Sequence, residues 1–130
     1  MSGTWVGFVN SQLPLPIERA EWEDPVLLVG GSNWSLQTTS TWRIVGRRSL
    51  VAGSEEEDSR GRVPELVDRP VIRCSRLTDS PCADLRLELT GGWLLEVFVA
   101  TCQDAWVLRL PSPPTLVPGP DLLDDWIEEG

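Results

Sequence analysis

The chain has 130 residues and a formal net charge of −9, with 41% hydrophobic and 24% charged residues. This length predicts one domain, residues 1–130, that is large enough to bury a single core. The acidity argues against nucleic acid or an anionic membrane as a partner, because both are bound by clustered cations, and it favours a basic protein partner.

The side chains present leave few means of catalysis. The chain has no His, Lys or Tyr, and all 11 basic residues are Arg; a GC-rich genome and selection against lysine are alternative explanations. No carboxylate pair, nucleophile motif or phosphate-binding loop stands out. Cys74, Cys82 and Cys102 lack the spacing of a metal site. We therefore expect no enzymatic activity, no cofactor and no metal.

Nothing in the sequence predicts a membrane span or a secretory signal. The apolar runs are shorter than the roughly 18 residues that a membrane helix needs, and the N-terminus lacks a basic region followed by an apolar run. A cytoplasmic location with reduced thiols is the expectation.

The first segment, residues 1–25, is expected to be irregular. Its apolar residues from Trp5 to Val9 show no clean period, so we expect at most a short strand before Asn10. The alternating prolines of Leu13–Pro16 exclude a helix there.

Two hairpins are predicted next. Val26–Val29 and Trp34–Thr38 are joined by a turn rich in glycine. Trp42–Val45 and Leu50–Ala52 flank the second turn, Gly46–Ser49.

The middle of the chain is polar and then briefly helical. Four consecutive acids, Glu55–Asp58, are interpreted as a solvated loop, because a calcium loop needs alternating ligands and a glycine at its turn. Val63–Asp68 suits one short helix with Pro64 in its first turn. Val71–Leu77 then predicts a strand.

A three-stranded antiparallel meander is predicted from Asp84–Leu89, Trp93–Val99 and Ala105–Leu110. A Thr90–Gly92 loop sets the first register, and the second loop sets the next. The predicted pairs are Leu89 with Trp93, Leu87 with Leu95, Leu85 with Val97, Val99 with Trp106, Val97 with Leu108, and Leu95 with Leu110. On the opposite face Arg86, Glu96 and Arg109 would form a charged row.

The meander has a counterpart earlier in the chain. Residues 26–52 repeat its order of apolar strand, glycine turn, strand beginning with Trp, and a further strand with Trp near its start. This predicts a duplicated three-strand unit, with Trp34 and Trp42 equivalent to Trp93 and Trp106, all four in the core. Face-to-face packing of the two units and one curved sheet are both compatible with it.

The C-terminal segment is expected to be an acidic amphipathic tail, residues 118–130. Thr115–Val117 predicts an edge strand. Within Asp121–Glu129 the apolar residues fall on one face at helical spacing. Docking of this helix on its own protein and docking on another are both open.

The fold class is therefore mainly β, with α+β as the alternative: a β-rich core over residues 26–117 lies between the irregular segment and the tail. The candidate partner-binding residues lie on the outer face of the meander and in the tail. They are Arg86, Leu94, Glu96, Phe98, Val107, Arg109, Trp126, Asp124 and Asp125.

Several short motifs resemble those of a known family. They are Trp42–Val45, Leu50–Asp58, Asp84–Leu89 with Leu95–Phe98, and Ala105–Trp106. Together they resemble a family of small uncharacterised bacterial proteins, frequent in high-GC actinobacteria, over about residues 26–110. The resemblance implies no established activity, and some similar small acidic proteins look like immunity proteins of toxin systems. The proline-rich N-terminus and the acidic tail with its tryptophan depart from the family pattern.

The functional expectation is a non-enzymatic protein-binding module, most concretely a toxin-neutralising immunity-type protein. One alternative is a structural or assembly subunit that forms a homodimer through its sheet or its tail. Another is a protein that binds a small ligand, for which a deep pocket lined by tryptophan would be the sign.

Overall fold

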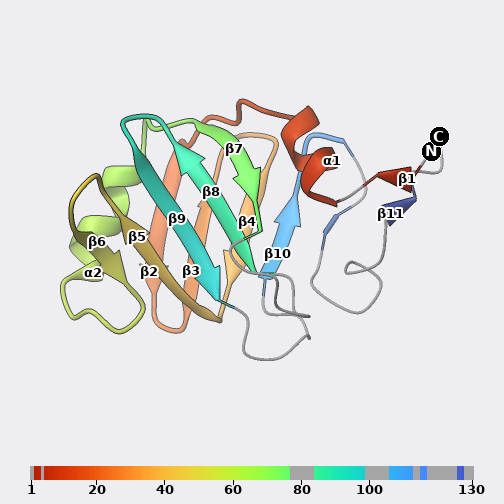
Figure 1. Ribbon diagram of the computed structural model, residues 1–130. Coiled ribbons are helices and arrows are strands. Elements are labelled where there is room, and N and C mark those ends of the chain that lie inside the picture. Colours follow the sequence, from red (N-terminus) through yellow and green to blue (C-terminus); the bar gives the residue numbers. More distant parts are fainter. Residues whose placement is uncertain are drawn as a thin grey trace.

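Two antiparallel sheets lie one in front of the other in the computed structural model of the chain (Figure 1). The structure describes residues 2–3, 5–76, 84–98, 106–112, 115–116 and 126–127, with the backbone alone at 2–3 and 126–127. The strands of the front sheet are, in spatial order, β6 (Leu50–Gly53), β5 (Thr41–Val45), β9 (Trp93–Phe98), β8 (Leu85–Leu89) and β7 (Val71–Ser75). Those of the rear sheet are β10 (Trp106–Arg109), β4 (Ser35–Thr38), β3 (Val26–Gly30) and β2 (Arg19–Glu23).

Short helices flank the two sheets. Helix α1 (Trp5–Ser11) lies at one end, and α2 (Ser59–Arg62) lies at the other end beside β6 and continues into the 3-10 helix η1 (Val63–Leu66) (Figure 1). Two further strands of two residues each, β1 (Ser2–Gly3) and β11 (Trp126–Ile127), pair with each other. Among the described residues, no helix is long and apolar enough to cross a membrane.

The core fills the space between the sheets. Because successive side chains in a strand point to opposite faces, alternate residues of each strand meet in this layer. Trp42 and Trp106 are fully buried there. Trp42 packs edge-on against Trp22 of the other sheet, with ring centroids 5.1 Å apart, and Trp106 packs against Trp5 of α1 at 5.5 Å. The tryptophans thus tie the sheets to each other and to α1.

The predicted fold class is confirmed: the protein is mainly β, with antiparallel sheets and a short helix in the middle. Both predicted hairpins form, as β3–β4 and β5–β6. The β8–β9 register is also as predicted, with Leu85 opposite Val97, Leu87 opposite Leu95 and Leu89 opposite Trp93. Of the four tryptophans placed in the core, Trp93 is the exception, since it is only half-buried beneath Arg69.

The third strand of the predicted meander is wrong. β10 lies in the rear sheet, where Trp106 pairs with Thr38 and Leu108 with Leu36. The free side of β9 pairs instead with β5, which puts Trp42 opposite Val97 and Ile44 opposite Leu95. The predicted partners of Val97 and Leu95 in the third strand are therefore incorrect, and Val99 lies outside the described residues. The alternation within a strand specifies which of its faces is buried. It does not specify the neighbouring strand, because several strands of this chain have apolar residues at matching positions.

These pairings reveal two equivalent units that exchange their last strands. In the first unit β2–β3–β4 form a meander and β5 crosses to the other sheet; in the second, β7–β8–β9 form a meander and β10 crosses back. The helices are exchanged in the same way. Helix α1, which precedes the first meander, packs against β7 of the second, and η1, which precedes the second meander, packs against β2 of the first. The strand order that the sequence predicted to repeat does recur in the topology, but over four strands and with the last strand of each repeat in the other sheet; common origin of the two units stays a prediction.

The N-terminal segment is more regular than expected. Trp5 and Val9 are one helical turn apart and both buried, so α1 replaces the expected short strand. Within Arg19–Glu23 the charged residues alternate with Ala20 and Trp22, and this segment forms β2. The alternation of β2 is a strand signal that the prolines around it obscured.

The C-terminal segment also differs where it is described. Trp126 and Ile127 pair with Gly3 and Ser2 in β11, so the helix predicted over residues 121–129 does not form there. A nine-residue acidic helix is marginal without packing, whereas strand pairing satisfies the backbone directly. The edge strand predicted at Thr115–Val117 is a single bridge between Leu116 and Leu108.

Candidate functional site

The two sheets present different outward faces. The outward face of the five-stranded sheet, called here the front face, has no helix or strand over it among the described residues (Figure 1). Val45, Leu94 and Phe98 lie half-buried on it, and at its two edges Leu50 and Ile72 are 47% and 51% exposed. Leu50 and Ile72 are the large hydrophobic side chains most exposed in the described chain. The front face therefore offers apolar area that water wets.

The outward face of the four-stranded sheet is also charged, but Leu50 and Ile72, the most exposed large hydrophobic side chains of the described residues, do not lie on it. β2 presents Arg19, Glu21 and Glu23 to solvent, and Gln37 and Arg109 are exposed on the other strands. Its apolar residues are half-buried among these charges. The contrast singles out the front face as the surface with the composition of a binding site.

A buried carboxylate lies at the centre of the front face. Glu96 is 2% exposed, and Arg43 and Arg86 stand directly opposite it on the neighbouring strands β5 and β8. Arg43 Nε lies 2.5 Å from Glu96 Oε1, and Arg86 Nε lies 3.0 Å from Glu96 Oε2. Each carboxylate oxygen thus accepts one charge-assisted hydrogen bond, which fixes the positions of both guanidinium groups.

Phe98 extends this cluster. The guanidinium carbon of Arg43 lies 5.0 Å from the centre of the Phe98 ring, within the range of a cation–π contact. Arg43 is therefore held by a carboxylate on one side and by an aromatic ring on the other. The result is a pre-organised patch of charged and apolar groups, whose own side chains lose less entropy when a partner binds.

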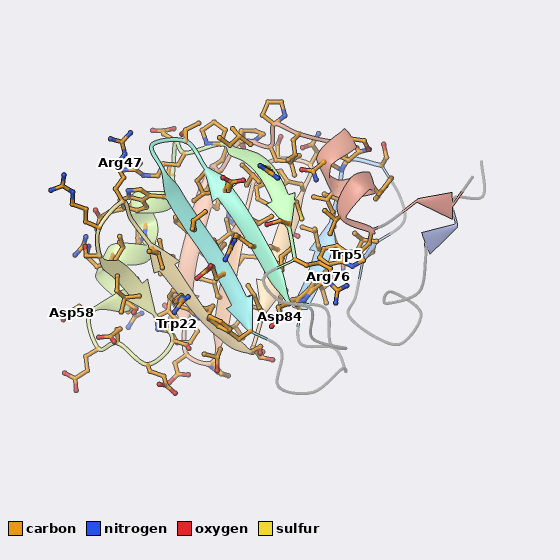
Figure 2. All side chains as sticks on the ribbon, in the orientation of Figure 1. Trp5, Trp22, Arg47, Asp58, Arg76 and Asp84 are labelled. Atoms are coloured by element: carbon orange, nitrogen blue, oxygen red, sulfur yellow. The ribbon has the colours of Figure 1, made fainter. Side chains whose placement is uncertain are left out.

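A surface pocket of about 690 Å³ adjoins the patch. This turn pocket lies between the β5–β6 turn and the loop that follows β6. The residues that line it are Thr41, Trp42, Arg43, Val45, Gly46, Arg47, Arg48, Ser49, Leu50, Gly53, Ser54, Glu55, Glu56 and Phe98. Figure 2 shows Arg47 extending from the β5–β6 turn into solvent. Trp42 is the one tryptophan among these lining residues, and its side chain is almost wholly buried in the core, so the pocket presents little tryptophan surface to a small ligand.

Side chains from the two helices occupy both edges of the five-stranded sheet. Asn10 of α1 accepts a hydrogen bond from the backbone N–H of Cys74 at 2.8 Å and donates one to its carbonyl at 2.9 Å. On the far edge, Ser59 of α2 accepts from the N–H of Gly53 at 2.9 Å and donates to its carbonyl. Because these edge groups are satisfied, the edges are poor places for a partner to add a strand.

The structure brings together only part of the predicted site. Arg86, Leu94, Glu96 and Phe98 share the front face as expected. Val107 and Arg109 do not, because β10 belongs to the other sheet and carries them on its outward face. The side chain of Trp126, and Asp124 and Asp125, lie outside the described residues.

Several residues of the site were missed. Arg43 takes the place that Arg109 was predicted to fill beside Glu96. Its signal was present, since Arg43 is the polar residue between buried Trp42 and buried Ile44. Arg47 and Arg48 belonged to a predicted turn and gave no sign that the turn borders a pocket.

Two features of the described residues bear on metal binding and on thiol chemistry. No group of three metal-ligating side chains occurs there. Burial raises the pKa of the Cys74 thiol to about 12, which disfavours the reactive thiolate. Comparisons with protein-family models, with curated proteins and with solved structures found no match.

Proposed function

We propose that this protein is a protein-binding module and that its partner binds the front face. The observation that carries the proposal is the combination found on the front face, where exposed Leu50 and Ile72 and half-buried Leu94 lie on the same surface as the fixed Arg43–Glu96–Arg86 cluster. Interfaces combine a desolvated apolar centre with a few ordered polar groups, and arginine is enriched in them.

The blocked edges support a face-on mode of binding. A partner that added a strand to the five-stranded sheet would have to displace Asn10 from Cys74 or Ser59 from Gly53. A partner that covers the front face displaces only water. Face-on binding is therefore the mode with the lower cost.

The most concrete form of the proposal is a toxin-neutralising immunity-type protein. It is supported by the small acidic chain, the shortage of catalytic side chains and the sequence resemblance described above. The natural probe is the product of the gene adjacent to the one that encodes this protein, because toxin and immunity genes are normally neighbours. Co-expression with this chain should relieve any growth inhibition by that product, and the purified proteins should form a complex.

Leu94 and Leu28 provide a matched pair of variants. Both are half-buried outward leucines on interior strands, Leu94 on β9 of the front face and Leu28 on β3 of the other sheet. Leu94→Asp should weaken the complex at least about tenfold, because it places a charge in a desolvated centre, and Leu28→Asp should leave it unchanged. Thermal melts verify that both variants fold. Equal affinity for the two variants would contradict the proposed face.

Self-association through the same face is the competing proposal. The exposed Leu50 and Ile72 at its edges favour this alternative. Sedimentation velocity separates the two, because a subunit that dimerises through the front face becomes monomeric with Leu94→Asp. A monomer at all accessible concentrations leaves only the heterologous partner.

A further inference from the structure

The distribution of charge within the molecule opposes its net charge. The front face and the β5–β6 turn carry five arginines, at positions 43, 47, 48, 73 and 86, and two acids, Glu88 and Glu96. The local formal charge is therefore 5 − 2 = +3, on a chain whose total is −9. Net charge steers distant encounters, but the groups at the contact decide which side chains are accepted.

Most of these arginines already have acidic partners. Arg43 and Arg86 bind Glu96, and Arg73 lies 3.4 Å from Glu88. Arg47 and Arg48 form no ion pair with any residue that the structure describes, and both are exposed. Two guanidinium groups at the rim of the turn pocket are thus available to an incoming anion.

The turn pocket is continuous with the front face. Arg43 and Phe98 line the pocket and also form part of the cluster around Glu96. A segment that lies across the face therefore reaches Arg47 and Arg48 without leaving the surface. The guanidinium fork of arginine matches the two oxygens of a carboxylate, so an Asp or Glu side chain is the group that fits best.

Acidic residues in the lining of the turn pocket limit how much negative charge a ligand can bring into it. Glu55 and Glu56 line it together with Arg47, Arg48 and Arg43, and Arg43 is already paired with Glu96, so the pocket and this partner have a formal charge of 3 − 3 = 0. An incoming carboxylate is therefore held by the two unpaired guanidinium groups of Arg47 and Arg48 and not by a net charge, and a run of acids would meet the two glutamates. The wall formed by Phe98 and Val45 favours an apolar neighbour for the acid.

We infer that the turn pocket binds one acidic side chain, with an apolar residue beside it, on a segment of the protein partner. This inference rests on the proposed function, and it names the chemistry of the partner's contact. It departs from the basic partner that the net charge favours, because the contact is made by the cationic part of an acidic molecule.

A peptide-display selection tests the inference without knowledge of the partner. A library of random peptides is selected on the intact wild-type protein, and in parallel on the double variant Arg47→Glu, Arg48→Glu. Wild-type selections should be enriched in peptides with one acid next to an apolar residue, and the double variant should bind those peptides at least about tenfold more weakly. Arg109→Glu is the matched control, since Arg109 is an exposed arginine of the other sheet, and it should leave affinity unchanged.

The outcomes separate the inference from the proposed function. Peptides that lose affinity with Leu94→Asp but not with the double arginine variant would overturn the acidic contact and leave the front face as the binding surface. Peptides whose affinity is unchanged by Leu94→Asp and by the double arginine variant would overturn both the acidic contact and the front face as the binding surface. Inorganic phosphate and glutarate are titrated as small anions; displacement of the peptides by either at a comparable concentration would overturn the protein segment in favour of a small-anion site.

Discussion

Glu96 is the residue on which the front face depends. Its carboxylate is buried and bonded to two arginines whose side chains are 49% and 36% exposed. A buried carboxylate is costly unless its partners compensate for the water it has lost, and here each oxygen has one. Removal of its charge leaves two arginines without their anion.

We expect Glu96→Gln to lower the free energy of unfolding by about 1–3 kcal/mol, less than the roughly 3–5 kcal/mol of a fully buried pair, because both arginines reach solvent. Urea unfolding measures the change. Glu88→Gln is the control: its pair with Arg73 is largely exposed, and the expected change is within about 0.5 kcal/mol. Equal losses for the two variants would show that burial of Glu96 has no energetic weight.

Cys74 gives the protein a titration in alkaline solution. Burial raises the pKa of its thiol to about 12 from a usual value of 9.0, so the folded state keeps the thiol neutral while the unfolded state ionises. Its contribution to stability is complete below about pH 9 and declines as the pH rises toward 12. The chain has no Lys and no Tyr, so few other groups titrate in this range.

Urea unfolding near pH 8 and near pH 10 tests this titration, since a full proton difference corresponds to about 1.4 kcal/mol per pH unit. Wild type should lose more stability between the two conditions than Cys74→Ala does. Alanine is a suitable replacement, because Ala20 holds the equivalent buried position on β2 of the other unit. Parallel pH profiles for the two proteins would contradict a buried neutral thiol.

At the scale of single residues, the sequence was informative wherever strands alternate. Arg86 and Glu96 were paired correctly because both follow from the register of one hairpin. Arg109 was placed wrongly and Arg43 was missed for the same reason: the third member of the row comes from a strand distant in sequence. The pattern of a strand determines which side chains point outward, whereas its neighbour is determined by the packing of the whole chain.

At the scale of elements, the β8–β9 turn carries the strongest backbone requirement. Gly91 and Gly92 have φ angles of +84° and +78°, which side chains other than glycine rarely adopt. A Cβ at Gly92 would also lie 3.0 Å from Cγ of Arg47. The turn thus depends on glycine for its conformation and for its contact with the rim of the turn pocket.

Gly92→Ala should therefore cost about 1–2 kcal/mol. Gly61→Ala is the matched comparison: Gly61 is helical, its added Cβ meets nothing within 4 Å, and a gain of up to about 1 kcal/mol is expected. Thermal unfolding of the two variants should give shifts of opposite sign. A shift of the same sign in both would mean that the turn tolerates a Cβ.

The elements predicted best were those specified by neighbouring residues. Hairpins β3–β4, β5–β6 and β8–β9 each combine two short runs, alternating or wholly apolar, with a turn rich in glycine, serine or asparagine. Helix α1 was missed because it has only seven residues. Its buried face consists of two of them, Trp5 and Val9, which is too few to show a helical period. The pocket was missed because it arises where a turn and a later loop meet in space.

At the scale of the molecule, neither unit completes a sheet by itself. The meander β2–β3–β4 receives β10 from the second unit, and β7–β8–β9 receives β5 from the first. Each meander also buries its inner side against the other sheet. A unit alone would therefore expose an edge strand and half of the core.

We expect fragments 1–57 and 58–130, cut in the loop after β6, to be unfolded when each is expressed alone and to form a folded one-to-one complex when expressed together. Size-exclusion chromatography and circular dichroism of the single and the mixed fragments measure this. Homodimerisation of one fragment would show instead that a unit can supply its own missing strand from a second copy.

The exchange of strands also determines when the protein can fold during its synthesis. β10 is the last strand of the four-stranded sheet along the chain, and α1 packs on β7, whose residues are synthesised much later. The first meander therefore leaves the ribosome without the strand and the opposite sheet that would cover its apolar side. Productive folding must therefore wait until nearly the whole chain has been synthesised, and over that interval the apolar side of the first meander stays uncovered.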